Sequence, residues 1–421
     1  MSILIANRGA PRSWLLAATF AALPLLAHAE PLPLSQALTR ALRADPTRLA
    51  FTARQDAARA AERQASRKPN PTLGLEVEDF AGTGAYGLID RTQATVSYQQ
   101  IEERGGKRQA RAAVARGEAA VAKARREVAV LDLLHEVELA WIEAAAAESR
   151  TRVAQERLGL AERTATEVGR RVRAARDPLF AGARAQAQLA EARLALDQAK
   201  AEAEAARRRL SAYWDGGGDF EIDPRWIEDL APADGLAAAP APVDLAVREA
   251  ERAAAEARIA LEKAKAVQDP TWRAGVRYLN DGGDVAFVVG GSIPLARHDT
   301  NQDAVVRARA ERTAAEADLA ATRTLAERHI ARLQASLAIR ASEARRLEAE
   351  ILPAQAQTVD LVRDGFNRGG FSYLDVIEAQ KALIDTKTRR LAVLAAFQRD
   401  HAELARLTGE HAALIPSETA R

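Results

Sequence analysis

The residues best placed to do chemistry in this sequence are two acids, Asp375 and Glu378, which follow a break in a long helical pattern at Gly369 and Gly370. A spacing of three residues puts both carboxylates on one face of a helix. Such a pair can attract cations, or it can be a solvated face that the helix dipole favours near an N-terminus. The two interpretations are compatible, and the residues alone leave both open.

Patterns typical of catalysis and of tight metal binding are missing from the sequence. It has no G-x-S-x-G, Walker or H-E-x-x-H pattern, and the paired acids Glu102 and Glu103 belong to a charged turn. There is no cysteine, the one methionine is Met1, and no two histidines beyond residue 29 are four residues apart. These histidines are His135, His298, His329, His401 and His411. We therefore predict no enzyme activity, no catalytic residue, no cofactor and no tight metal site.

Residues 1–29 have the features of a secretory signal peptide. Two arginines precede the apolar run WLLAATFAALPLLA, and Ala27-His28-Ala29 satisfies the small-x-small rule for cleavage. The run is shorter than the roughly 20 residues that a membrane-spanning helix needs. Without this segment the chain is close to neutral, so its charge does not suggest a nucleic-acid partner.

The rest of the chain contains one design twice. Sliding the sequence by 194 residues places residues 171–186 on residues 365–380, and it places Gly159 on Pro353. The second match predicts a hinge, or a change of supercoil, at the corresponding place of both halves. We assign residues 30–214 to the first repeat, 215–243 to a Gly/Pro-rich linker, 244–409 to the second repeat and 410–421 to a C-terminal tail.

Helical patterns fill most of both repeats. The first runs from residue 34 to about residue 67, with Ser35 placed to cap it. The alanine-rich, proline-free stretch 106–176 would form a helix roughly 100 Å long. Residues 302–368 would form its counterpart, followed by a helix from 371 to about 407. Rods of this length do not fit a compact domain.

Four short segments alternate apolar and polar residues with the period of a strand, near 72–79, 92–101, 271–279 and 285–293. Their lengths suit tilted membrane strands with an apolar outer face and a polar inner face. Four strands cannot close a barrel, and an open sheet edge is not tolerated in lipid, so several chains must close it together. Three copies would give twelve strands. The alternative is a pair of hairpins that cap a soluble helical bundle.

The alternation also assigns roles to particular strand residues. The polar face would line the barrel lumen with charges of both signs, carried by Glu76, Glu78, Arg273 and Arg277. Aromatic residues on the opposite face suit a membrane-interface girdle, namely Tyr98, Trp272 and Tyr278.

Three stretches resemble the TolC-type outer membrane factors, which are the outer-membrane channels of tripartite efflux pumps. They are LPLSQALTRALRADP, NPTLGLEVEDF with the later GGKRQAR, and ILPAQAQTVDLVRDGFNRGGFSYLDVIEAQKAL. The resemblance covers nearly the whole chain after residue 29. VEDFAGTG with GGKR, and the form GGFSYLDVIEAQ, are most similar to the heavy-metal branch of cobalt-zinc-cadmium resistance channels.

The resemblance implies a mainly α fold with a small β part. A homotrimer would form a twelve-stranded barrel in the outer membrane of a Gram-negative bacterium and an α-helical tunnel through the periplasm. The tunnel would contact a periplasmic adaptor, or membrane fusion protein, and through it an inner-membrane pump of the resistance-nodulation-division type. We expect export of heavy-metal cations. The alternatives are a channel of a multidrug efflux or type I secretion system, and a periplasmic coiled-coil scaffold that is not a channel.

The resemblance also assigns the ends of the helices. The adaptor-contacting hairpin tips would include Arg176, Asp177, Pro178, Arg368, Gly369, Gly370 and Phe371. Asp375 and Glu378 of three copies would form an acidic ring around the periplasmic aperture.

Two departures from the family pattern stand out. The family's tip tyrosine and its arginine partner fall on Phe366 and Phe371, so a polar latch would have to come from Arg368 or Arg176. The second departure is YQQIEERGGKR, with its extra charged residues where the first hairpin passes into a helix.

Overall fold

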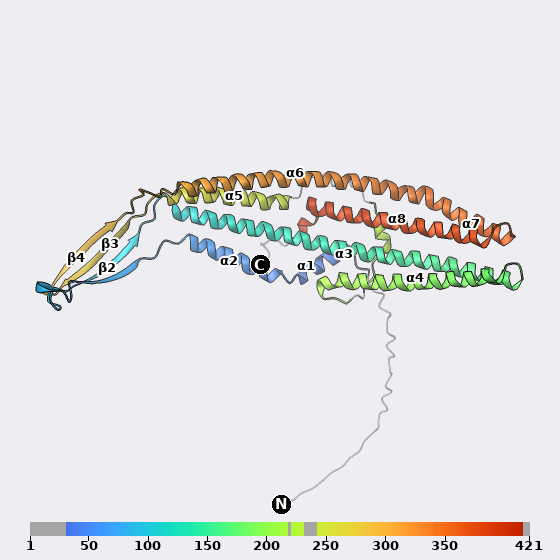
Figure 1. The fold of residues 1–421 in the computed structure, drawn as a ribbon, viewed down its shortest axis with the longest axis horizontal. Helices are drawn as coiled ribbons and strands as arrows, with labels where there is room; N and C mark the ends of the chain where they lie inside the picture. The colour runs from blue at the N-terminus through green and yellow to red at the C-terminus, as the bar shows by residue number, and fades with distance from the viewer. Residues whose placement is uncertain (1–30, 218–219, 231–241, 416–421) are drawn as a thin grey trace, which may run out of the picture.

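The computed structural model describes residues 31–217, 220–230 and 242–415. The molecule is a long rod, with strands at one end and helices along the rest of its length (Figure 1). The predicted signal peptide lies outside the described residues, as do parts of the predicted linker and of the C-terminal tail.

Eight α-helices lie in the described part of the chain. They are α1 (Leu34–Ala44), α2 (Arg48–Ala65), α3 (Lys107–Arg173), α4 (Leu179–Ser211), α5 (Pro242–Lys265), α6 (Gln302–Arg346), α7 (Leu352–Arg368) and α8 (Tyr373–Thr408). A π-helical turn, Leu347–Ile351, joins α6 to α7. Short 3-10 helices are η1 (Gly84–Tyr86), η2 (Ala212–Trp214), η3 (Pro224–Glu228) and η6 (Glu410–Leu414).

The longest helix, α3, has 67 residues, which corresponds to about 100 Å and confirms the predicted rod. Its middle is packed with alanines, and Ala144 to Ala147 are almost inaccessible to solvent. Because alanine has little bulk, neighbouring helices can approach α3 closely without losing helix propensity.

The helices form two four-membered layers that share α3. Near the strands, contacts run in the order α2, α3, α5, α6, and towards the far end they run α4, α3, α8, α7. The main core lies where these layers meet, around Leu134, Trp141 and Leu210. There Trp226 of η3 packs edge-on against Trp141, with ring centroids 4.2 Å apart.

The four strands are β1 (Thr72–Glu78), β2 (Gln93–Ile101), β3 (Thr271–Leu279) and β4 (Asp284–Ser292). They form one antiparallel sheet in the order β1-β2-β3-β4, so the two predicted hairpins are joined by pairing of β2 with β3.

The sheet register confirms the two-faced pattern expected from the sequence. One row across the sheet is Leu75, Val96, Val276 and Phe287, all apolar and exposed in this chain. The opposite face is polar, and Thr95 and Ser97 on it are buried.

The predicted cap at Ser35 is wrong. The helix begins two residues earlier than a cap at Ser35 implies, at Leu34, and its N-cap position is Pro33 with an extended backbone and no side-chain cap. Ser35 therefore lies inside the first turn, where its carbonyl accepts a hydrogen bond from the Thr39 hydroxyl. The helical stretch is also split at Asp45 and Thr47 into α1 and α2.

Of the two alternatives predicted for Gly159 and Pro353, the matched hinges are wrong. The second half has an irregular turn just before Pro353, but α3 continues unbroken through Gly159. Proline lacks an N–H and its ring clashes with the carbonyl four residues back, whereas glycine keeps its N–H and causes no clash. The same position in the two repeats therefore has different mechanical consequences.

Two glycines on the polar face of the sheet offer a test of the register between β2 and β3. A Cβ at Gly275 would lie 2.5 Å from the Val96 carbonyl oxygen, whereas a Cβ at Gly290 would meet nothing within 4 Å. We expect Gly275→Ala to destabilise the protein by about 1–3 kcal/mol, because β2 must shift, and Gly290→Ala to be nearly neutral. Scanning calorimetry of both variants measures the difference, and equal melting temperatures would contradict the register.

Candidate functional site

The end of the rod opposite the sheet consists of two helical turns, which we call tip one (between α3 and α4) and tip two (between α7 and α8). In tip one the chain reverses through Ala175, whose φ of 53° is left-handed. Pro178 is extended and precedes the first residue of α4, so it ends the turn rather than starting the helix. Asp177 accepts hydrogen bonds of 2.8 and 3.0 Å from the Arg171 guanidinium. This interaction raises the pKa of Arg171 and fixes the turn.

Tip two depends on its glycines. Gly369 has a φ of 85°, and its amide donates to the Phe366 carbonyl, while the Gly370 amide donates to the Gly365 carbonyl at 2.8 Å. The Phe371 ring lies so close to Gly365 that a Cβ there would be 2.0 Å from the ring. Gly365 is therefore required by packing, which the sequence pattern had not indicated.

The side chain of Arg171 in tip one forms a polar contact with tip two, next to the apolar cluster that also packs the two tips together. Arg171 Nη1 donates to the Phe366 carbonyl oxygen at 2.6 Å, and the guanidinium carbon lies 4.3 Å from the centroid of the Phe366 ring. The sequence had pointed to Arg176 or Arg368 as the source of a polar latch at the tips. Both are exposed, and neither side chain has a hydrogen bond or ion pair among the described residues. The signal that could have identified Arg171 is the acid Asp177, six residues later across the turn.

The two acids after tip two have different surroundings. Asp375 accepts hydrogen bonds of 2.7 Å from the amide and the hydroxyl of Ser372, and that hydroxyl accepts from the Asp375 amide. This reciprocal cap starts α8, and the hydrogen bonds from Ser372 lower the pKa of Asp375. Glu378 is exposed and has no hydrogen bond or ion pair within the part of the chain that the structure describes. Asp375 thus has a structural role, while Glu378 remains available.

At the sheet end, the four predicted lumen charges pair across β2. Arg273 lies 3.3 Å from Glu76, and Arg277 lies 3.1 Å from Glu78. Arg277 also donates to Thr95 and Gln93, both at 2.9 Å. The polar face therefore carries paired charges rather than a field of one sign.

The three predicted girdle residues are half-exposed and lie on the apolar face at two levels. Tyr98 and Trp272 are near the helical end of the sheet, and Tyr278 is near the far end. Trp272 and Tyr278 are six residues apart on β3, which is about 20 Å along the strand.

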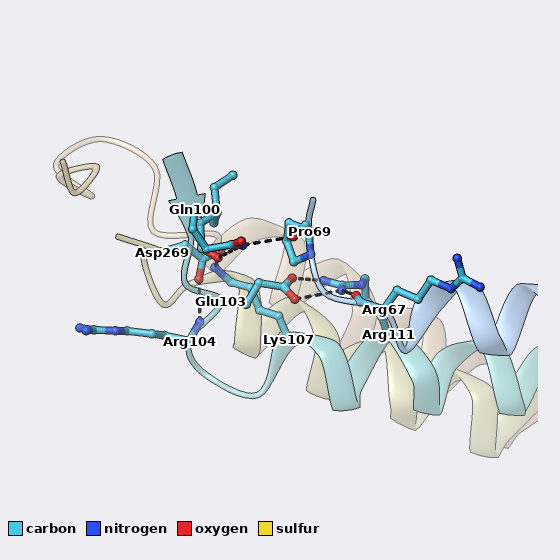
Figure 2. Close-up of polar contacts among 9 residues, drawn as sticks. Arg67, Pro69, Gln100, Glu103, Arg104, Lys107, Arg111 and Asp269 are labelled. Atoms are coloured by element: carbon cyan, nitrogen blue, oxygen red, sulfur yellow. Dashed lines mark hydrogen bonds and ion pairs between the residues drawn. The ribbon is translucent and has the colours of Figure 1, made fainter. Parts of the chain in front are cut away.

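A polar network fixes the junction between strands and helices (Figure 2). Arg111 forms a two-pronged ion pair with Glu103 and donates to the Arg67 carbonyl at 3.2 Å. Asp269 accepts from the Arg104 amide at 2.9 Å and pairs with Lys107 at 2.7 Å. These contacts tie together the linkers before β1, after β2 and before β3.

The balance of forces at Asp269 favours its charged form. Burial raises the pKa of Asp269, but the hydrogen bonds from Arg104 and Lys107 outweigh burial and lower it. Glu103 and Arg104, the charged residues that depart from the family pattern, thus belong to the polar network that fixes the junction between strands and helices.

The described residues hold no group of three or more His, Cys, Asp or Glu side chains arranged to bind a metal ion.

Among the helices of the described ranges, none is both long enough and apolar enough to cross a membrane.

A small sheet with one apolar face, continued by a rod of helices of which the longest is about 100 Å, and ending in two tips, is the fold of the TolC-type outer-membrane channels. The solved structure of CusC, described in terms of transmembrane channel formation, superposes with a TM-score of 0.70 at 17% identity and covers 89% of this chain and 92% of that chain. The MtrE outer membrane channel of Neisseria gonorrhoeae gives a TM-score of 0.68 at 17% identity, over 90% of this chain and 89% of that chain. At these identities the structures establish the fold.

The sequence relatives are heavy-metal resistance proteins. The cobalt-zinc-cadmium resistance protein CzcC of Cupriavidus metallidurans is 28% identical over 377 residues, which are 87% of this chain and 87% of that protein. The nickel-cobalt-cadmium resistance protein NccC of Alcaligenes xylosoxydans xylosoxydans is 28% identical over 293 residues, covering 69% of this chain and 67% of that protein. No family model matches the chain. The resemblance to TolC-type outer membrane factors of the heavy-metal branch is confirmed by these relatives and this fold.

The contact between the tips generates a prediction. Arg171→Ala removes the charge-assisted hydrogen bond to Phe366 and the pair with Asp177, so the amides of residues 366–372 should exchange hydrogen about tenfold faster. Arg171→Lys keeps the charge without the planar fork and should give an intermediate rate. Arg170→Ala is the matched control, because Arg170 is exposed and its side chain pairs with Glu167 on the same helix. Hydrogen exchange with mass spectrometry measures these rates, and identical rates in all variants would exclude the link.

Proposed function

We propose that three copies of this chain form an outer-membrane channel that exports heavy-metal cations as part of a tripartite efflux system. The observation that carries the proposal is the sheet register, which places apolar side chains on one face of four strands and paired charges on the other. A wall of this kind separates lipid from a water-filled lumen.

The edges of the chain support assembly with further copies. In the described structure β1 and β4 each pair with one strand only, and lipid offers no partner for the backbone groups of an open edge. The order of helix contacts places α2 and α6 at the edges of the layer near the strands, and α4 and α7 at the edges of the layer near the tips. One rotation can therefore join neighbouring copies along the full length of the rod. Three copies with four strands each would close a twelve-stranded barrel.

The names of the relatives suggest the cargo. CzcC and NccC are named for resistance to cobalt, zinc, cadmium and nickel. A conduit for such cations should not bind them tightly, and weak attraction by Glu378 and Asp375 near the narrow end would suffice. Paired charges in the barrel would leave little barrier for a cation and its counter-ions.

The tips offer a surface for a periplasmic adaptor. Leu179 and Phe180, which directly follow Pro178, are 83% and 71% exposed, and Phe371 of tip two is half-exposed. Large apolar side chains at the end of a rod form a patch that a partner can bury. An adaptor bound there would connect the channel to an inner-membrane pump of the resistance-nodulation-division type.

Deletion of the gene tests the proposed cargo. We expect the deletion strain to lose growth at graded zinc, cobalt, cadmium or nickel concentrations, and complementation to restore it, because metal would accumulate behind the missing channel. Sensitivity confined to dyes and antibiotics would instead support a drug-efflux channel. If the protein washes free of the membrane fraction without detergent, the periplasmic scaffold is supported and the channel is excluded.

The acids near tip two should influence ion selectivity. In planar bilayers, Glu378→Gln should lower the ratio of cation to anion permeability by about threefold, because three carboxylates leave the narrow end of the pore. Asp375→Asn should also lower the ratio, and the asparagine side-chain oxygen can still accept the hydrogen bond from the Ser372 amide. Asp197→Asn on α4 removes an exposed acid far along the helix from the tip and is the matched control. Reversal potentials in a salt gradient measure the ratio, and no difference from the control would exclude an acidic aperture.

A further inference from the structure

The side chains on the apolar face of β2 become steadily more polar towards the C-terminal end of the strand. Ala94 and Val96 are apolar, Tyr98 is aromatic, Gln100 is polar and Glu102 is charged. The Glu102 amide donates to the Pro270 carbonyl at 2.9 Å, which continues the β2–β3 ladder one step, so Glu102 faces the same side as Tyr98. Hydrocarbon, interface and head group follow one another in this order at the edge of a bilayer. Glu102, about 13 Å beyond Tyr98, therefore lies at the level of lipid head groups.

Three side chains meet at this level. Trp272, which is opposite Gln100 on β3, donates from its indole nitrogen to Glu102 Oε2 at 2.8 Å. Arg104 Nη2 lies 3.4 Å from the same oxygen, and the side chains of Arg104 and Glu102 are 47% and 50% exposed. The hydrogen bond from Trp272, and then that from Arg104, lower the pKa of Glu102, so the carboxylate is charged at neutral pH.

Both charged groups have capacity left for a ligand. Within the described ranges, Glu102 Oε1 and the Nε and Nη1 atoms of Arg104 have no hydrogen-bond partner. The Arg104 backbone is held by Asp269, so its side chain extends from a fixed point, and Figure 2 shows it pointing away from the helices and from the rest of the network. The Glu102–Arg104 pair is therefore exposed and can still bind a ligand, since the network at the junction does not occupy all of its polar atoms.

A second copy of the chain would not cover this place. Copies would meet at β1 and β4, whereas Glu102, Arg104 and Trp272 belong to the central pair, β2 and β3, and to the turn after β2. On the apolar side of a central strand pair, the neighbour is lipid.

We propose that Glu102, Arg104 and Trp272 bind the phosphoethanolamine head group of a membrane phospholipid. The ammonium group would donate to Glu102, the phosphate would accept from Arg104, and the glycerol end would lie against Trp272. A choline head group has no N–H to donate, and a phosphoglycerol head group has no cation to match Glu102. The inference rests on the proposed outer-membrane location.

Native mass spectrometry of the full-length protein in detergent tests the proposal, with short-chain phosphatidylethanolamine, phosphatidylcholine and phosphatidylglycerol as probes. The wild-type protein should retain phosphatidylethanolamine about threefold more strongly than either other lipid, as expected for one exposed charge pair. Glu102→Gln should abolish that preference while leaving phosphatidylglycerol binding intact or stronger. Arg104→Gln should weaken all three lipids. Arg332→Gln, on an exposed part of α6, should change nothing.

Several results would overturn the head-group site. Equal retention of the three lipids by the wild-type protein would do so, as would variants indistinguishable from Arg332→Gln. Displacement of phosphatidylethanolamine by an equal concentration of inorganic phosphate would show a phosphate site with no contribution from the amine. A protein that forms channels but lacks the preference contradicts this inference alone, whereas a protein that needs no detergent contradicts the proposed function as well.

Discussion

The unmet hydrogen bonds at the two edges of the sheet constrain the rest of this molecule. Four strands pair with one another and leave β1 and β4 open, in a face pattern that suits lipid on one side. Open backbone groups are costly in lipid, so the proposed outer-membrane location requires that further copies close these edges. The helical layers repeat the same arrangement below the sheet, with α2 and α6, then α4 and α7, at their edges. The requirement for a partner at both edges thus applies to the sheet and to both layers of helices.

The sequence predicted the elements well because their patterns are long or strictly periodic. Four alternating segments identified the strands to within one residue at each end, and an alanine-rich stretch without proline identified α3. The errors occurred where a single residue decides the outcome. Ser35 is a good cap by type, yet the N-cap position is Pro33, two residues earlier. Gly159 aligns with Pro353 without sharing its effect on the backbone.

The candidate site was predictable only in part, for the same reason. Residue type and resemblance located Asp375, Glu378 and the tip glycines. They could not locate Arg171, because it belongs to a run of similar arginines and its partner Phe366 is 195 residues away in the chain. The junction was noticed as a departure from a pattern, but its meaning depends on contacts among Glu103, Arg111 and Asp269 that only the folded chain brings together.

The unequal backbones of the two long rods have a mechanical consequence. α3 is one continuous helix from the strand junction to tip one, so its hydrogen-bond ladder connects that tip to the sheet without a break. The other rod has a compliant joint at the π-helical turn Leu347–Ile351, where the regular hydrogen-bond ladder changes step. Bending at this turn would let α7 move against α6, while α8 stays bound to α3 through Gln380–Thr164 and Lys387–Glu156. One long rod of the molecule is therefore regular throughout and the other has a place where it can bend, so α7 can move without disturbing the sheet.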